Sequence, residues 1–362
     1  MNHEVSKTNQ IFLITVLVSL TASFLPISVL FPDYTSRLLF SELILAAPGA
    51  TYLLAGNRSY AKAVRLKPLR IGTVLWLILF TVCIMPVMGM VNAISMLFVE
   101  NSTSTMMGEI VTGNSYFTSM ILIALLPCIF EESVYRGMFY NEYRKVSPIR
   151  GMLLSALLFG LMHGNLNQFS YAFFMGIVFA VAIEATDSIL ASMIMHFLIN
   201  GFSTTMMFIM GMLDDNLLQE ATDMTSSAET LGSVIGLYLP IALVGLVFAI
   251  IVLRVMAAGE GRLEYIDSLL HLSRKKNINK TKTKKKDIES EFSTEENGIT
   301  VQMENITENL GRADIEEENN KDTQRDSLIL EKNIFVRQRL FTAPLVAGII
   351  LCTILMILNE VL

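Results

Sequence analysis

Long apolar stretches separated by short polar breaks run along most of this chain. A helix needs about 20 apolar residues to cross a bilayer core of about 30 Å. The pattern therefore predicts an all-α, polytopic transmembrane bundle of eight or nine spans, the fifth and sixth of which are barely separated. The candidate spans lie near residues 11–31, 38–56, 71–98, 116–140, 149–164, 167–185, 188–211, 231–256 and 341–360.

The composition agrees with a membrane protein. Of the 362 residues, 52% are hydrophobic and only 17% are charged, whereas soluble domains carry about 25% charged residues. The cysteines Cys83, Cys128 and Cys352 lie far apart in apolar stretches, so we expect small buried side chains rather than disulfides. Nothing in the chain indicates a nucleic-acid partner.

The loops predict the orientation of the chain. Lysine and arginine gather in alternate loops, and cytoplasmic loops are the ones that carry such an excess. We therefore expect a cytoplasmic N-terminus and, after nine spans, an external C-terminus; the mostly short loops favour a bacterial plasma membrane. The basic loops are 58–70, 144–150 and 274–286, and acidic residues occupy 100–109 and 214–229.

Three regions follow from these patterns. Residues 1–257 form the predicted transmembrane bundle and residues 340–362 a C-terminal transmembrane helix. Between them, residues 258–339 are highly charged and poor in aromatic residues, which predicts a largely disordered cytoplasmic segment, with a short amphipathic helix at 263–272. The basic run 274–286 could bind anionic lipid or could simply be a solvated tether.

Charged residues interrupt the fourth apolar stretch. A charge at membrane depth costs at least about 2–3 kcal/mol unless it is paired or hydrated. Glu132 and Arg136 are four residues apart, the spacing of an ion pair on one helix face, so we interpret them as a structural pair. Glu131 points about 100° away from Glu132. It is therefore free for chemistry, as a general base.

Two further apolar stretches carry polar side chains. His163 lies in the fifth stretch, and His196 and Asn200 share one face of the seventh. At 1.5 Å per residue, Glu131, His163 and His196 lie about 12–20 Å from their cytoplasmic ends, so the three side chains could converge. A single membrane histidine is commonly a packing contact, but a glutamate and two histidines at similar depth predict a hydrolytic site.

These motifs resemble those of the CAAX-protease and bacteriocin-processing family, which includes type II CAAX prenyl endopeptidases and bacterial proteins of the Abi type. The resemblance covers about residues 115–205. It implies a helical bundle with a water-holding cavity open to the cytoplasm and glutamate-dependent peptide hydrolysis. By this resemblance Glu131 and His163 activate water, and His196 and Asn200 stabilise the oxyanion. The motifs are Glu131-Glu132-x-x-x-Arg136, Phe159-x-x-x-His163 and His196-x-x-x-Asn200.

A metal is one open question. Glutamate with two histidines matches a catalytic zinc ligand set that leaves one position open, so Glu131, His163 and His196 are candidate ligands for a divalent metal such as zinc. However, Glu131 cannot easily be both a ligand and the sole base. We expect metal dependence and leave the ligand assignment open.

The motifs favour an intramembrane protease that cuts membrane-bound peptides or proteins, and two other functions are alternatives. A non-catalytic immunity or scaffold protein of the same family would share the motifs. A proton-coupled transporter also uses membrane carboxylates, but it should show internal repeats, and none is visible. Glu42 and Glu184 also fall in or near spans, and we expect them near an interface or hydrogen-bonded between helices.

Overall fold

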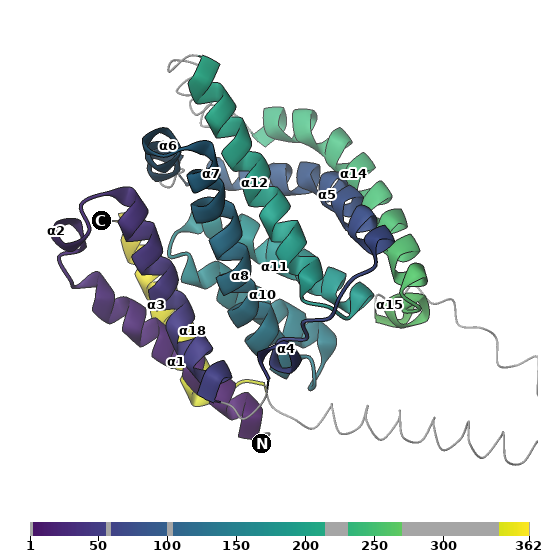
Figure 1. Cartoon of the computed structure of the whole chain (residues 1–362), viewed down its shortest axis with the longest axis horizontal. Helices are drawn as coiled ribbons and strands as arrows, with labels where there is room; N and C mark the ends of the chain where they lie inside the picture. Colours follow the sequence, from purple (N-terminus) through teal and green to yellow (C-terminus); the bar gives the residue numbers. More distant parts are fainter. Residues whose placement is uncertain (1–2, 56–58, 100–103, 214–230, 270–339, 362) are drawn as a thin grey trace, which may run out of the picture. The chain divides into compact units, whose positions relative to one another are not determined.

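The computed structural model describes residues 3–55, 59–99, 104–213, 231–269 and 340–361, and every regular element within them is helical (Figure 1). The predicted all-α fold is therefore confirmed. The elements are α1 (His3–Ser23), α2 (Ile27–Leu30), α3 (Tyr34–Ala55), α4 (Tyr60–Ala63), α5 (Ile71–Met96), α6 (Ser104–Gly113), α7 (Tyr116–Ser119), η1 (Met120–Leu125), α8 (Leu126–Glu132), η2 (Ser133–Tyr140), α9 (Asn141–Tyr143), α10 (Pro148–Met162), α11 (Leu166–Thr186), α12 (Leu190–Leu213), α14 (Leu231–Gly259), α15 (Leu263–Leu269) and α18 (Ala343–Val361).

Each of the nine predicted spans overlaps a helix of the described residues, the first over only part of its length. Six of these helices are long and apolar enough to cross a membrane, and α3, at the second predicted span, is not among them. Two more apolar helices, Pro148–Met162 and Ala343–Asn359, are shorter. Among the described residues, the six long ones are Glu4–Ser23, Ile71–Met96, Tyr116–Tyr143, Leu166–Thr186, Leu190–Met212 and Ile235–Gly259.

The first span differs from its prediction, because α1 begins at His3 and ends at Ser23 instead of spanning 11–31. Polar residues near its start are buried in contacts with other helices; Asn9, for example, is completely buried. Pro26 precedes the separate short helix α2. Most of the predicted disordered segment, with its basic run 274–286, lies outside the described residues, although Leu263–Leu269 forms the expected short helix α15.

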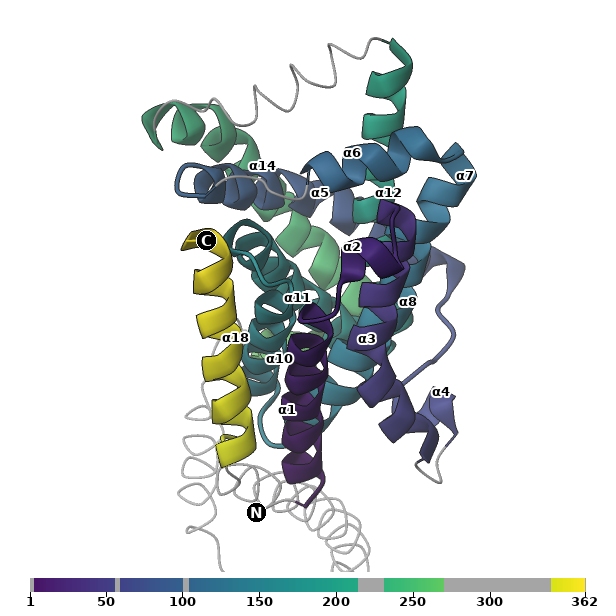
Figure 2. The same cartoon turned by 90° about the vertical axis from the view of Figure 1, so that its left-hand side faces the viewer.

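The C-terminal helix α18 packs on the central hairpin of α10 and α11. Helix α18 lies against α1, α10 and α11, and α14 packs along α5 (Figure 2). The tight turn of the hairpin has a local cause: Gly164 has φ +72°, which glycine adopts without strain. Asn165 then accepts a hydrogen bond from the Gln168 amide at 2.7 Å, which caps the N-terminus of α11.

The residues from Tyr116 to Tyr143 form one continuous helical run. Within it, the α-helical turn α8 is flanked by two π-helical segments, η1 and η2. A π-helical segment widens the turn and rotates the side chains that follow it, and such segments are common at functional sites. Glu131 and Glu132 lie at the end of α8, directly before η2.

A polar cluster joins four segments at one end of the bundle. Glu184, at the end of α11, is fully buried. It is hydrogen-bonded to several segments, which is one of the two arrangements expected from the sequence. Its carboxylate lies near Arg144 (2.6 and 2.7 Å), Tyr265 (2.7 Å), Tyr140 (2.9 Å), Arg65 (3.4 Å) and Arg262 (3.5 Å). The neighbouring Asp187 is paired with Arg65 and Lys67.

Asp187 makes this cluster sensitive to acid. Burial alone would raise the pKa of Asp187, but hydrogen bonds and charges from Lys67 and Arg65 lower it from 3.8 to about 2. A lowered pKa in the folded state stabilises the protein above about pH 4, and this stabilisation is lost as the pH falls toward 2. We expect Asp187→Asn to be less stable than the parent at pH 7 and to show a flatter fall in Tm between pH 4 and 2, measured in detergent. Parallel Tm curves for the two proteins would contradict this role.

The contact between α5 and α14 depends on Gly245. A Cβ atom at this position would lie 2.5 Å from the Cys83 carbonyl oxygen, which belongs to the backbone and cannot turn aside. We expect Gly245→Ala to lower stability by about 1–3 kcal/mol through overpacking, seen as a lower Tm in detergent. Gly236→Ala, on the same helix with no atom within 4 Å, is the matched control. Equal Tm values for the two variants would argue against close packing here.

Candidate active site

The predicted pair of Glu132 and Arg136 comes together in the structure. Nη1 of Arg136 lies 2.9 Å from Oε1 of Glu132, and both side chains are 0% exposed. An isolated charge at such a position would be strongly unfavourable. Each residue therefore keeps the other in its charged form inside the bundle.

Aromatic rings surround the remainder of the Arg136 guanidinium. Its central carbon lies 4.1 Å from the ring centroid of Phe159 and 5.1 Å from that of Phe179, so α10 and α11 both offer a π face to the cation. Gly176 makes room for this arrangement. A Cβ there would lie 2.7 Å from Ala156 and 3.2 Å from Nη2 of Arg136.

His196 connects the two glutamates. Its Nδ1 lies 3.0 Å from Oε1 of Glu132, and its Nε2 lies 3.7 Å from Oε2 of Glu131. A carboxylate can only accept, so Nδ1 carries the hydrogen of the shorter contact. Glu132 therefore orients His196 as well as pairing with Arg136. This second partner was missed in the sequence, because it comes from α12 and no spacing along the chain indicates it.

His163 ends α10 at the turn of the central hairpin. Its Nδ1 donates to the Phe159 carbonyl oxygen at 2.9 Å, which leaves Nε2 free to accept. The rings of His163 and Phe159 are nearly perpendicular, with centroids 4.9 Å apart, and the Phe159 ring also lies 6.2 Å from that of His196. Phe159 is thus in ring contact with both histidines.

Asn200 lies one turn beyond His196 on α12. It is partly buried, and its Nδ2 donates to the carbonyl oxygen of Ile123 in η1 at 3.1 Å. An asparagine amide has two hydrogens, so one is used in joining the helices and the other is available to a ligand.

A third carboxylate, which the sequence did not place here, lies near Glu131. Glu42 on α3 is 7% exposed, α3 packs against α8, and the carboxyl groups of Glu42 and Glu131 are close enough to interact electrostatically. Within the described part of the chain, Oε2 of Glu42 has no hydrogen-bond partner. The Glu131 side chain is 11% exposed, in contrast to the fully enclosed Glu132. Of the two neighbouring glutamates, Glu131 is therefore the accessible one.

A comparison with protein families matches residues 113–202 to the family described as Type II CAAX prenyl endopeptidase Rce1-like. Over these residues, called the Rce1-like segment below, the chain is similar to this family. The match spans about a quarter of the chain, and it includes every motif residue described above. It confirms the resemblance found in the sequence and, together with the apolar helices, supports a CAAX-type protease function in an integral membrane protein. The curated proteins and the solved structures gave no match.

The metal prediction was tested against the donor atoms of the Rce1-like segment. Nδ1 of both histidines is engaged, which leaves Nε2 for a ligand, as is usual for metal-binding histidines. However, no group of three histidine, cysteine, aspartate or glutamate side chains in the described ranges is arranged to hold a metal ion. A divalent metal such as zinc, with Glu131, His163 and His196 as its ligands, therefore stays a prediction.

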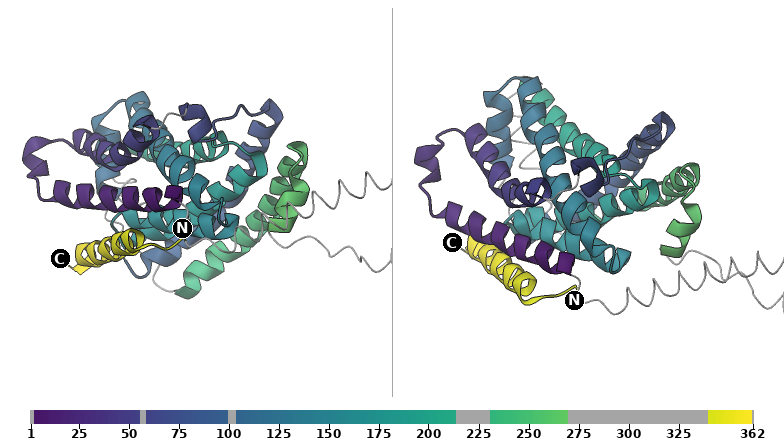
Figure 3. Two further views of the ribbon diagram at one scale, coloured as in Figure 1. Left: turned by 90° about the horizontal axis from the view of Figure 1, so that it is seen from below. Right: turned by 60° about the horizontal axis from the view of Figure 1, so that its bottom comes forward.

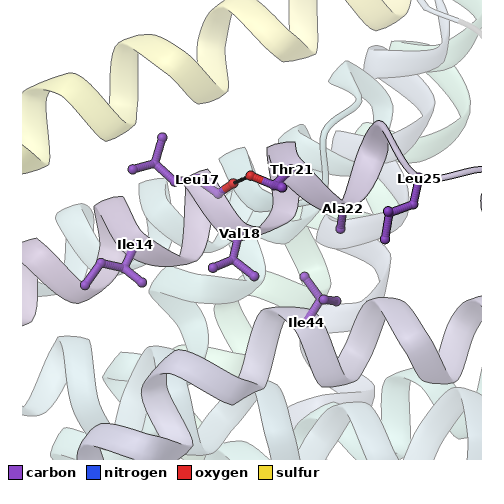
Figure 4. A pocket seen from close by; sticks show the side chains of 7 residues that line it. All are labelled: Ile14, Leu17, Val18, Thr21, Ala22, Leu25 and Ile44. Carbon is purple, nitrogen blue, oxygen red and sulfur yellow. Dashed lines mark hydrogen bonds between the residues drawn. The ribbon is translucent and has the colours of Figure 1, made fainter.

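An apolar pocket lies apart from these motifs. It has a volume of about 370 Å³ between α1 and α3, and Figure 4 shows its aliphatic walls. The lining residues are Ile14, Leu17, Val18, Thr21, Ala22, Leu25 and Ile44. None of them belongs to the Rce1-like segment, and none carries a titratable group.

Removing Arg136 should destabilise the fold. In Arg136→Met the buried carboxylate of Glu132 loses its cation, and breaking a buried ion pair in this way costs about 3–5 kcal/mol. We expect a low yield of folded protein and a lower Tm in detergent. Arg150→Met, the same substitution at an exposed arginine on α10, should behave as the parent does. Arg136→Met with the yield and Tm of Arg150→Met would refute the role of the ion pair.

Proposed function

We propose that the chain is an intramembrane endopeptidase that hydrolyses peptide bonds in membrane-associated peptides or proteins. The observation that carries the proposal is the arrangement around His196, whose ring lies between a buried glutamate and an accessible one. Peptide hydrolysis requires a base beside a water molecule and donors near the developing oxyanion. Side chains of both kinds lie in this part of the bundle.

The proposed first step is the activation of water by Glu131 and His163. Glu131 accepts a proton from the water molecule, while the free Nε2 of His163 accepts a hydrogen bond from its other O–H group. The water oxygen then attacks the carbonyl carbon of the peptide bond and forms a tetrahedral intermediate. A positioned general base of this kind typically contributes about 10²- to 10⁴-fold to the rate.

The proposed second step is the collapse of this intermediate. Its oxyanion accepts a hydrogen bond from the amide hydrogen of Asn200 that Ile123 does not engage. In its imidazolium form, His196 adds a second donor through Nε2 while Nδ1 donates to Glu132. The C–N bond breaks, and Glu131 returns its proton to the leaving nitrogen. The ion pair of Glu132 and Arg136 acts through His196, because Glu132 fixes the ring that faces the reaction.

We also propose a cytoplasmic N-terminus in a bacterial plasma membrane, with the site open toward the cytoplasm. Basic residues of loops that lie far apart in sequence, Arg65, Arg144 and Arg262, meet around Glu184 at one end of the bundle. An excess of basic residues is typical of the cytoplasmic side. The substrate class is a membrane-bound peptide or protein, and the family name adds prenylated C-terminal peptides to the candidates.

The decisive variants are Glu131→Gln, which removes the base without changing its size, and His163→Ala. We expect both to abolish hydrolysis, with a rate loss of at least about 10²-fold, and to leave the yield and Tm of the protein unchanged. The measurement is mass spectrometry of peptide termini in membranes from cells that express the parent or a variant. Termini produced by the parent should be missing from both variants.

Glu109→Gln, which changes an exposed glutamate on α6, is the matched control and should give the parent's termini. Identical termini in the parent and in Glu131→Gln would show that the chain is not a protease, and a non-catalytic role would then be favoured.

A further inference from the structure

Helix α18 lies beside the site although it is outside the Rce1-like segment. It follows residues 270–339 in the chain, yet it packs against α1, α10 and α11. Figure 3 shows it alongside the N-terminal helix, with the two ends of the chain coloured yellow and purple. Nothing in the matched family segment accounts for this helix.

The end of α18 contacts the turn that carries His163. Nδ2 of Asn359 donates to the carbonyl oxygen of Gly164 at 3.0 Å. About two turns earlier, Sγ of Cys352 lies 3.7 Å from Sδ of Met162. The two contacts therefore hold the residues directly before and after His163.

The middle of α18 supports the ring on which His163 rests. Cys352 and Met356 are each 5% exposed and belong to the same buried cluster as Tyr135 and Phe159. The rings of Tyr135 and Phe159 lie 5.0 Å apart. The Phe159 carbonyl oxygen also accepts the hydrogen bond from His163. Residues of α18 thus belong to the cluster that holds Phe159, and Phe159 contacts His163 through both its ring and its backbone.

The beginning of α18 is fixed independently of the site. Nδ2 of the buried Asn9 donates to the Leu340 carbonyl oxygen at 2.8 Å and to Oγ1 of Thr342 at 2.9 Å. Tyr143 in turn donates to Oδ1 of Asn9 at 2.7 Å. At Gly348, a Cβ would lie 2.8 Å from the Phe12 ring, so α1 and α18 are in close contact. These contacts fix the position of α18 along its axis relative to α1 and thereby place Asn359 at the turn.

We infer that α18 is a positioning element for His163, and that Asn359 is the residue through which it holds the turn. The inference rests on the proposed function, because it concerns how Nε2 of His163 is aimed at the water molecule. Gly164 permits the left-handed turn but does not enforce it, since glycine adopts many conformations. The hydrogen bond from Asn359 selects the one in which His163 faces the site.

The test compares three variants in liposomes, with a synthetic peptide that reproduces one of the Glu131-dependent termini as substrate. We expect Asn359→Ala to lower kcat about two- to tenfold, the range for one neutral hydrogen bond, with KM unchanged. Backbone amides 162–166 should exchange hydrogen faster. Asn359→Gln, which restores a donor, should recover kcat, and Leu358→Ala, at a 44% exposed neighbour, should match the parent.

The inference is overturned if Asn359→Ala keeps the parent's kcat, if Leu358→Ala lowers kcat equally, or if Asn359→Gln gives no recovery. Failure of the proposed function has a different signature, because Glu131→Gln would then cleave as the parent does. In that case the catalytic role of His163 is also wrong. The rate of hydrogen exchange at backbone amides 162–166 then shows whether Asn359 holds the turn.

Discussion

The arrangement of this bundle depends on one requirement, which is that the buried carboxylate of Glu132 must have partners. It lies at 0% exposure, and Oε1 accepts from Nη1 of Arg136 and from Nδ1 of His196. Because Arg136 also lies between the rings of Phe159 and Phe179, four helical segments meet around one charge. In a low dielectric these contacts are strong when complete and costly when broken, so they fix the helices relative to one another.

The same requirement gives the adjacent residues Glu131 and Glu132 different environments. Glu132 is enclosed and holds His196, whereas Glu131 stays partly accessible on the other side of the same imidazole. The π-helical segments on each side of α8 change the direction of the helix face near this pair. Glu42, from a helix outside the family segment, adds a further carboxylate near Glu131. The environment of Glu131, the proposed base, is therefore set in part by Glu132 and Glu42, which have no proposed part in the chemistry.

The sequence predicted what depends on local spacing. Apolar stretches predicted the approximate positions of nine helices, the first of them imprecisely. The four-residue spacing of Glu132 and Arg136 predicted their contact, because both residues lie on one face of the same helical run. Contacts between distant segments left no such signal. The bond from His196 to Glu132, the position of Glu42 and the partners of Glu184 join residues 40 or more positions apart, and they depend on how helices pack. The first span was misplaced because Asn9 and other polar residues near its start pack against neighbouring helices.

The attachment of both flanks of the long charged insert has a consequence for its evolution. On one side Arg262 and Tyr265 are bonded to Glu184, and on the other Leu340 is bonded to Asn9. Both ends of this connection are thus fixed on the bundle, and the entropic cost of joining two fixed points grows only with the logarithm of the number of residues between them, so doubling that number costs about 0.6 kcal/mol. Insertions and deletions there can accumulate in related proteins almost without thermodynamic penalty, while the last helix keeps its register on the bundle.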